Sequence, residues 1–173
     1  MTEASFKFKL CILGEPAVGK TSLIYRFIEN KFRKDYKSTL GVNLFTHDID
    51  LGEPGIIGLQ MWDLGGQSSF KKLRKTYIEG ARGALVVFDL TKKESFEKLD
   101  EWIEGFKEIR GGEPLYLVGN KFDLKDEIVV SEKDMVDLAK KNGMESIMTS
   151  AKTGENVIKA FTKLAEAILK KSS

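Results

Sequence analysis

The fold of this 173-residue chain follows from one short stretch, Gly14-Glu15-Pro16-Ala17-Val18-Gly19-Lys20-Thr21, and from its flanks. The stretch matches the pattern G-x-x-x-x-G-K-[ST]. The apolar run Phe6–Leu13 before it predicts a strand, and Ser22–Ile28 after it has the apolar spacing of a helix. A glycine-rich turn between strand and helix lets backbone N–H groups and the helix N-terminus face phosphate oxygens. We therefore predict a phosphate-binding loop in which Gly14 to Ser22 contact a nucleotide.

Strand-like runs and helical segments alternate along the rest of the chain. Val42–Leu51 and Ile56–Trp62 flank the turn-rich residues 52–55 and predict a hairpin. Ala84–Leu90 and Leu115–Val118 are nearly all apolar. Such runs are typical of strands in a parallel sheet that is covered on both faces. The sequence therefore supplies both a hairpin and a set of buried parallel strands.

Apolar residues at helical spacing supply the covering helices. They recur at Phe96, Leu99, Ile103 and Phe106, and again at Val157, Phe161, Leu164 and Ile168. Ser131 is placed to cap another helix over Glu132–Lys141. The order predicts an α/β fold of the P-loop NTPase type, a three-layer sandwich with a six-stranded, mostly parallel sheet, one antiparallel hairpin strand and about five helices. Residues 1–173 would form this single domain.

Composition and charge exclude several classes of protein. A net charge of +2 and a pI of about 8.5 argue against a nucleic-acid partner, since such binders carry a concentrated basic face. Cys11 is the single cysteine, so no internal disulfide can form. No apolar run has the length of a membrane span or a secretory signal, so we expect a cytoplasmic protein. The C-terminus carries no prenylation cysteine, which leaves open a peripheral membrane association without evident lipidation or a trimmed tail.

Two residues of the phosphate loop carry specific roles, and one is unusual. The Lys20 ammonium is expected to bridge the β- and γ-phosphates, and the Thr21 hydroxyl to ligate Mg²⁺. Pro16 has no N–H and fills a position that many such loops give to a small residue. We expect its ring to lie beside the γ-phosphate. The loop alone indicates a nucleoside triphosphate and leaves the base open.

Two later segments point to guanine. Asn120-Lys121-Phe122-Asp123 follows a predicted strand, and the Asp123 carboxylate can accept hydrogen bonds from guanine N1–H and the exocyclic amine. Adenine lacks this pair of donors, so a site built for them rejects it. Lys121 can lie along the base, and Asn120 can tie this loop to the phosphate loop. In Ser150-Ala151-Lys152, the backbone N–H of Ala151 could donate to guanine O6.

A third segment, Trp62-Asp63-Leu64-Gly65-Gly66-Gln67, closes the hairpin. Asp63 is expected to hold Mg²⁺ through a water molecule, and the Gly66 N–H to reach the γ-phosphate. Gln67 is expected to orient the attacking water. With these motifs in place, the chain resembles a small GTPase of the Ras superfamily over essentially its whole length, and is most similar to the Rab type.

The resemblance implies further site residues and a switch. Thr39 would be the switch I threonine, completing Mg²⁺ coordination only with GTP bound, so that Gln67, Lys20 and Thr39 form the catalytic set. Phe32 would lie against the guanine edge, and Tyr36 would close over the γ-phosphate. Loss of the γ-phosphate would release both switch segments, a change that partners can detect. Effectors, an exchange factor and a GTPase-activating protein are implied partners of a monomer that regulates membrane traffic or cell organisation.

The chain also departs from the Rab pattern. Its Trp-Asp-Leu-Gly-Gly-Gln segment resembles Arf and heterotrimeric Gα proteins, which indicates a deep-branching or prokaryotic relative. Trp62 and Tyr77 match two members of an effector-binding aromatic trio, and the third falls at Leu44 or Phe45. No arginine stands three residues before Thr39, where Gα proteins carry a catalytic one. We therefore expect slow hydrolysis, on the order of 10⁻⁴ to 10⁻³ s⁻¹.

Two alternatives remain open from the sequence. A P-loop kinase for a small acceptor would leave the segments around Asp63 and Asp123 unexplained. A nucleotide-dependent interaction module with negligible hydrolysis is opposed by Gln67 but favoured by Pro16.

Overall fold

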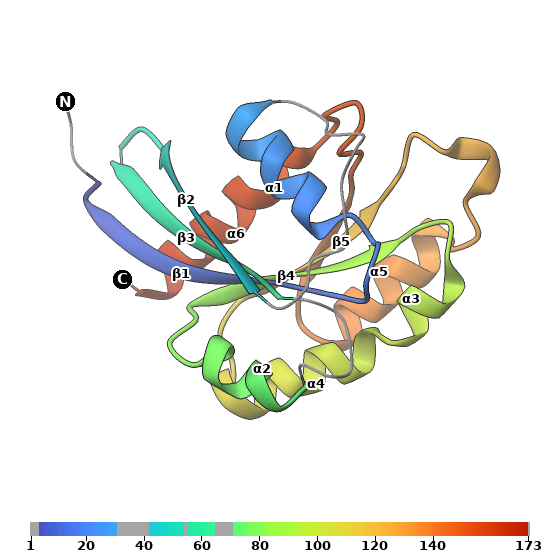
Figure 1. Ribbon diagram of the computed structural model, residues 1–173, viewed down its shortest axis with the longest axis horizontal. Helices are drawn as coiled ribbons and strands as arrows, with labels where there is room; N and C mark the ends of the chain where they lie inside the picture. The colour runs from blue at the N-terminus through green and yellow to red at the C-terminus, as the bar shows by residue number, and fades with distance from the viewer. Residues whose placement is uncertain (1–3, 31–41, 54, 65–70, 173) are drawn as a thin grey trace.

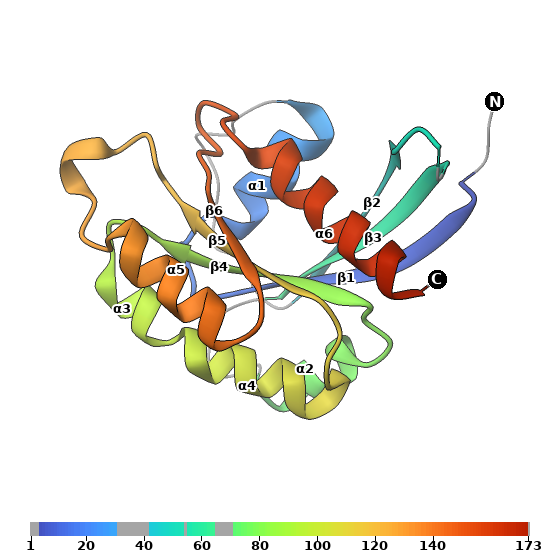
Figure 2. The same cartoon turned by 180° about the vertical axis from the view of Figure 1, so that it is seen from behind.

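A central sheet lies between two layers of helices in the computed structural model (Figure 1). The structure describes residues 4–30, 42–53, 55–64 and 71–172. The helices α1 and α6 cover one face of the sheet, and α2, α3, α4 and α5 cover the other, as the reverse view also shows (Figure 2). The predicted three-layer α/β sandwich is therefore confirmed.

The sheet has six strands in the order β2-β3-β1-β4-β5-β6 within the described residues. The neighbours of β1, β4 and β5 all pair in parallel, and β2 pairs with β3 antiparallel, which confirms the predicted hairpin. The strands are β1 (Phe6–Leu13), β2 (Val42–Asp50), β3 (Ile56–Leu64), β4 (Gly83–Asp89), β5 (Leu115–Asn120) and β6 (Glu145–Met148).

The described helices agree with the expected number when α3 and α4 are taken together, since only Lys98 separates them. The cap predicted for α5 is present, because the Ser131 hydroxyl oxygen accepts a hydrogen bond from the Asp134 N–H at 3.0 Å. The helices are α1 (Lys20–Glu29), α2 (Lys71–Ile78), α3 (Lys93–Glu97), α4 (Leu99–Arg110), α5 (Glu132–Lys141) and α6 (Val157–Ser172), with a 3₁₀ turn, η2, at Lys125–Glu127.

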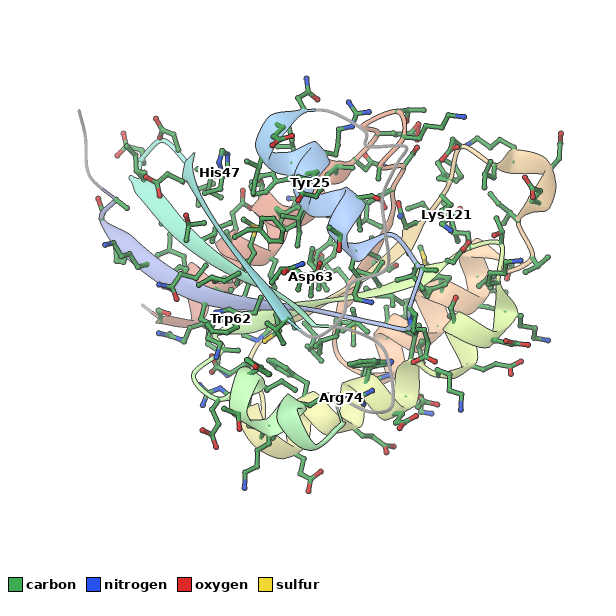
Figure 3. The ribbon with its side chains drawn as sticks, viewed as in Figure 1. Tyr25, His47, Trp62, Asp63, Arg74 and Lys121 are labelled. Carbon is green, nitrogen blue, oxygen red and sulfur yellow. The ribbon has the colours of Figure 1, made fainter. Side chains whose placement is uncertain are left out.

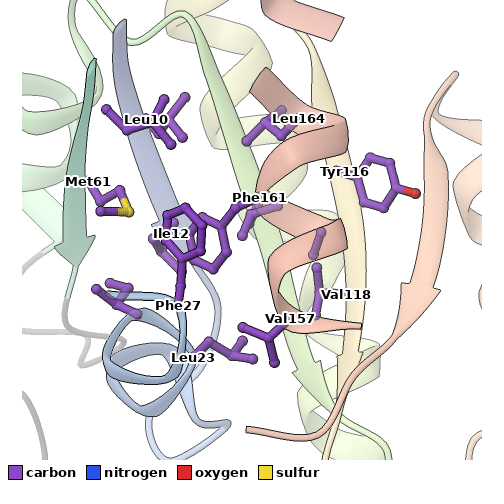
Figure 4. Packing of buried hydrophobic residues seen from close by; sticks show 14 of the residues in the cluster. Leu10, Ile12, Leu23, Phe27, Met61, Tyr116, Val118, Val157, Phe161 and Leu164 are labelled. Atoms are coloured by element: carbon purple, nitrogen blue, oxygen red, sulfur yellow. The ribbon is translucent and has the colours of Figure 1, made fainter. Parts of the chain in front are cut away.

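The core is split by the sheet into two apolar layers. Every residue of β4 is buried, as expected for a central parallel strand. On the α1 and α6 side, the rings of Phe27 and Phe161 stack with centroids 4.2 Å apart (Figure 4). On the other side lies Cys11, which is fully buried; burial raises the pKa of its thiol to about 12 and keeps it protonated.

The parallel strands bring distant loops to one edge of the sheet. The carboxyl ends of β1, β3, β5 and β6 all lie at the same edge of the sheet, the edge at which such sheets bind ligands. The phosphate loop, Asp63 and both predicted base-reading loops are therefore at the same edge.

Candidate functional site

Two glycines give the phosphate loop its shape. Gly14 has φ +147°, and a Cβ there would lie 2.2 Å from the Val87 carbonyl oxygen. Gly19 has φ +100°, and a Cβ there would lie 2.2 Å from the Asn120 amide nitrogen. A side chain at Gly14 would collide with the backbone of β4, and one at Gly19 with the Asn120 side chain at the end of β5. The buried Val18 anchors the loop in the core, whereas Pro16 is exposed.

Lys20 places its ammonium group inside this loop. Helix α1 begins at Lys20, two residues earlier than the predicted helix, and the side chain is only 5% exposed. Its Nζ donates to the carbonyl oxygens of Gly14 at 2.8 Å and Glu15 at 2.9 Å. Burial lowers the pKa of Lys20 to about 8, and the charges of Asp63 and Glu15 partly offset this effect. The loop therefore holds a cation that phosphate oxygens would stabilise.

The pKa of Lys20 predicts two opposite responses to pH. Phosphate oxygens favour the ammonium form, so GDP affinity is expected to fall above about pH 8, by up to about tenfold per pH unit. Conversely, a folded-state pKa below the ordinary 10.5 means that unfolding takes up a proton, so the nucleotide-free protein gains stability as pH rises from about 8 to about 10.5. Titration calorimetry and thermal melts from about pH 7 to about pH 9 measure both effects.

Lys20→Arg is the control for this prediction, since a guanidinium keeps its charge over the whole range. The variant is expected to show neither response, and a wild-type affinity that stays flat with pH would contradict the prediction.

Thr21 and Asp63 face each other at the start of α1 and the end of β3. Both side chains are buried, and the Thr21 hydroxyl donates to Asp63 Oδ2 (Asp63 is labelled in Figure 3). A hydroxyl and a carboxylate are the hard oxygen donors that Mg²⁺ prefers, and Mg²⁺ sites commonly use one protein carboxylate with phosphates and water. The pair therefore fits the predicted ion. Ser22, the next residue, is also buried.

Asn120 connects the phosphate loop to the loop after β6. Its amide nitrogen donates to the Val18 carbonyl at 3.0 Å. Its oxygen accepts from the Thr149 hydroxyl at 3.0 Å and from the Ala151 N–H at 3.3 Å. One buried side chain thus holds three segments together, and any ligand that contacts one of them meets the others in a defined position.

The Asp123 carboxylate lies beside the other base-reading loop. Its Oδ1 accepts a hydrogen bond from the Ser150 hydroxyl at 2.8 Å. Ser150 is buried, and its oxygen also accepts from the Thr153 N–H at 3.0 Å, so it connects Asp123 to the turn that follows β6. Lys152 follows in this turn and is exposed.

Lys121 is held by a residue that the motif analysis missed. It has φ +70°, and its Nζ donates to the Ala17 carbonyl at 3.0 Å. The same nitrogen lies 2.9 Å from Oδ2 of Asp89, which is 2% exposed (Lys121 is labelled in Figure 3). Asp89 is the last residue of β4 and follows an otherwise apolar run, and a carboxylate in this position was a signal that the sequence could have provided.

A second unpredicted contact joins the phosphate loop to α4. The Trp102 indole N–H donates to a Glu15 carboxylate oxygen at 2.8 Å. The guanidinium of Arg74, on α2, lies 3.6 Å from the centroid of the same indole. The side chain of Glu15 therefore points toward α4, so its contact with a nucleotide would come from the backbone.

The structure separates the two candidates for the effector trio. In the β2–β3 register Leu44 lies opposite Trp62, whereas Phe45 lies opposite Met61, and neighbouring residues of a strand point to opposite faces. Trp62 packs on Tyr77 with ring centroids 5.6 Å apart, and Leu44 is 51% exposed. Phe45 instead packs against Tyr25 on α1. Leu44 therefore lies on the same face of the sheet as Trp62 and its neighbour Tyr77, whereas Phe45 lies on the other face.

Several predicted site residues fall outside the part of the chain that the structure describes. They are Phe32, Tyr36, Thr39, Gly66 and Gln67. None of the described helices is long and apolar enough to cross a membrane.

The chain matches the family model described as Ras family over residues 9–170. It is 40% identical to Ras-related protein Rab-13 of Canis lupus familiaris over 166 residues, which are 95% of this chain and 81% of that protein. It is 38% identical to Rab-1 of Theileria parva over 97% of this chain and 77% of the relative. It is 39% identical to Rab-21 of Geodia cydonium over 96% of this chain and 73% of that protein. The chain therefore belongs to the Ras family of GTP-binding small GTPases and is Rab-like.

Proposed function

We propose that this protein is a switch that binds GTP or GDP with Mg²⁺, hydrolyses GTP slowly, and recruits effectors in its GTP state. The observation that carries the proposal is the side chain of Asn120, which ties the phosphate loop to the loop of Ala151. This contact would align a cationic phosphate site with a site for a purine base.

Selection of guanine would rest on Asp123 and Ala151. The carboxylate of Asp123 would accept from N1–H and the exocyclic amine, and the N–H of Ala151 would share its hydrogen between the Asn120 oxygen and O6. Support comes from the hydrogen bonds that hold both groups in place, since Ser150 donates to Asp123 and Asn120 accepts from Ala151. A base that lacks these donors leaves the carboxylate unpaired, which is costly in a half-buried site.

Phosphate binding would use the buried cation and the loop backbone. Lys20 would exchange its two carbonyl contacts for β- and γ-phosphate oxygens, and backbone N–H groups of the loop would donate to the phosphates. Thr21 would hold Mg²⁺ directly and Asp63 through a water, with Thr39 added in the GTP state. Bound Mg²⁺ would neutralise charge that develops on the β- and γ-oxygens.

Hydrolysis would depend on Gln67, which orients the attacking water, and would remain slow without an arginine from a partner. The side chains of Leu44, Trp62 and Tyr77 would form a surface that effectors bind in the GTP state. The Rab resemblance makes regulation of membrane traffic or of cell organisation the cellular role that we propose.

A binding module with negligible hydrolysis is the second candidate. Pro16 favours it, because the exposed ring stands in the phosphate loop and removes one N–H from it.

The nucleotide content and turnover of the purified protein test these two candidates. Released nucleotide is expected to be GDP, and turnover with Mg²⁺ is expected near 10⁻⁴ to 10⁻³ s⁻¹, on the order of other unassisted GTPases. Gln67→Leu is expected to slow hydrolysis about tenfold or more while GTP affinity stays unchanged, because Gln67 acts on the water and not on binding. Single-turnover assays over a range of concentrations of radiolabelled GTP measure the hydrolysis rate and the GTP affinity of both proteins.

GTP retained without turnover would favour the binding module. Bound adenine nucleotide would contradict the guanine site, and a Gln67→Leu rate equal to the wild type would assign the water to another group.

A further inference from the structure

Arg26 lies on the last turns of α1 and reaches the loop that follows β6. Its Nε donates to the Ala151 carbonyl at 2.8 Å, and its Nη2 donates to the Lys152 carbonyl. Its Nη1 donates to the carbonyl of Asn30 at 3.1 Å. None of the nucleotide-binding motifs includes Arg26, yet its guanidinium joins the end of α1 to the proposed guanine loop.

Both backbone polar groups of Ala151 are hydrogen-bonded to side chains. Its N–H donates to the Asn120 side-chain oxygen at 3.3 Å, and its carbonyl accepts from Arg26. A residue whose two peptide groups are both bonded cannot rotate about its backbone without breaking one of them. Asn120 fixes the peptide group that carries the Ala151 N–H, and Arg26 fixes the peptide group that follows it, so Arg26 sets where Ala151 lies in the loop. The Ala151 N–H would share its hydrogen between the Asn120 oxygen and guanine O6, and its distance to O6 therefore depends on Arg26.

Arginine suits this position for a geometric reason. A guanidinium presents several N–H donors in one plane, so it can bind the successive carbonyls of Ala151 and Lys152 and still reach Asn30. Gly154 lies beside the side chain, and even a Cβ there would make only an ordinary van der Waals contact, 3.5 Å from Arg26 Cδ. Lysine would keep the charge but has a single nitrogen to share among these acceptors.

We propose that Arg26 is a positioning residue for guanine recognition, which holds Ala151 in place so that its N–H reaches O6. This inference rests on the proposed function, since it assigns a further residue to the same guanine site. The residue acts through the loop and does not touch the base, so its loss should impair one base contact and spare the others.

The test uses Arg26→Gln with three nucleotides that differ at single base atoms. GDP is compared with 6-thio-GDP, which replaces O6 by a weak acceptor, and with IDP, which lacks the exocyclic amine read by Asp123. In the wild type each change is expected to weaken binding about three- to tenfold or more. In Arg26→Gln we expect GDP affinity to fall about tenfold. The ratio of the Kd for 6-thio-GDP to the Kd for GDP should drop to about twofold or less, whereas the ratio of the Kd for IDP to the Kd for GDP should equal that of the wild type.

Arg110→Gln is the matched control. Arg110 is also half-buried, and its Nε donates to the Ala81 carbonyl at 2.7 Å, but this contact lies before β4 at the opposite edge of the sheet. Its removal is expected to lower the melting temperature as much as Arg26→Gln does, with all three affinities unchanged. Arg26→Lys, expected to lie between wild type and Arg26→Gln, provides the same test if the glutamine variant does not fold.

The outcomes separate the two proposals. A wild type that binds no guanine nucleotide would overturn both the function and the role of Arg26. If the wild type binds GDP but Arg26→Gln changes both ratios alike, or neither, Arg26 is only a structural residue and the proposed function stands.

Discussion

Lys20→Ala is expected to lower the affinity for GTP and GDP by roughly 10²- to 10³-fold, about 3–4 kcal/mol. The side chain is buried and its ammonium lies within the phosphate loop, bonded to the carbonyls of Gly14 and Glu15. Without it, the β- and γ-phosphates would lose the one side-chain cation of the loop, and the backbone N–H groups, the helix N-terminus and Mg²⁺ would have to balance their charge alone. Displacement of a fluorescent GDP analogue measures the change.

Lys107→Ala is the control, because Lys107 also donates to a backbone carbonyl, that of Asn142 at 3.3 Å, but from the exposed surface of α4. Its nucleotide affinity is expected to equal that of the wild type. Full GDP affinity in Lys20→Ala would place the phosphates elsewhere and remove the basis for the phosphate loop.

Asp123→Asn is expected to weaken guanine nucleotides by roughly 10²- to 10⁴-fold and to raise the affinity for xanthine nucleotides. The substitution would affect the two hydrogen bonds that guanine N1–H and the exocyclic amine donate to the carboxylate, each worth about 1.5–3 kcal/mol. Xanthine has a carbonyl where guanine has its exocyclic amine, so an asparagine amide can donate where the carboxylate only accepted. The fold should tolerate the change, because the asparagine oxygen can still accept from the Ser150 hydroxyl.

Binding of GDP and XDP to both proteins measures this inversion. Asp126→Asn provides the matched control, because Asp126 is an exposed carboxylate in the neighbouring turn η2, and the variant should keep the wild-type preference for GDP. An unchanged GDP affinity in Asp123→Asn would show that another group recognises the base.

Most of the fold could be predicted because its signals are local. The strand before Gly14, the helix after Gly19 and the cap at Ser131 each depend on residues within a few positions of one another. The buried strand β4 was equally clear, because covered parallel strands need an unbroken apolar run. The start of α1 at Lys20 was not predicted, since the helix begins inside the motif itself.

The site could be predicted in part. The motif residues Lys20, Thr21 and Asp63 lie together as expected from their positions after parallel strands. The residues that hold them were not found, because Asp89 and Trp102 belong to no motif and reach the site from other elements.

The chain's order of apolar runs, glycines and short motifs was enough to assign the sheet, the phosphate loop and the family resemblance, because each of these depends on neighbours in sequence. Contacts between remote residues required the folded chain. Arg26 and Ala151 are 125 positions apart, and no local rule pairs them. The choice of Leu44 over Phe45 likewise came from strand register, since a shift of one residue exchanges the two faces of a strand.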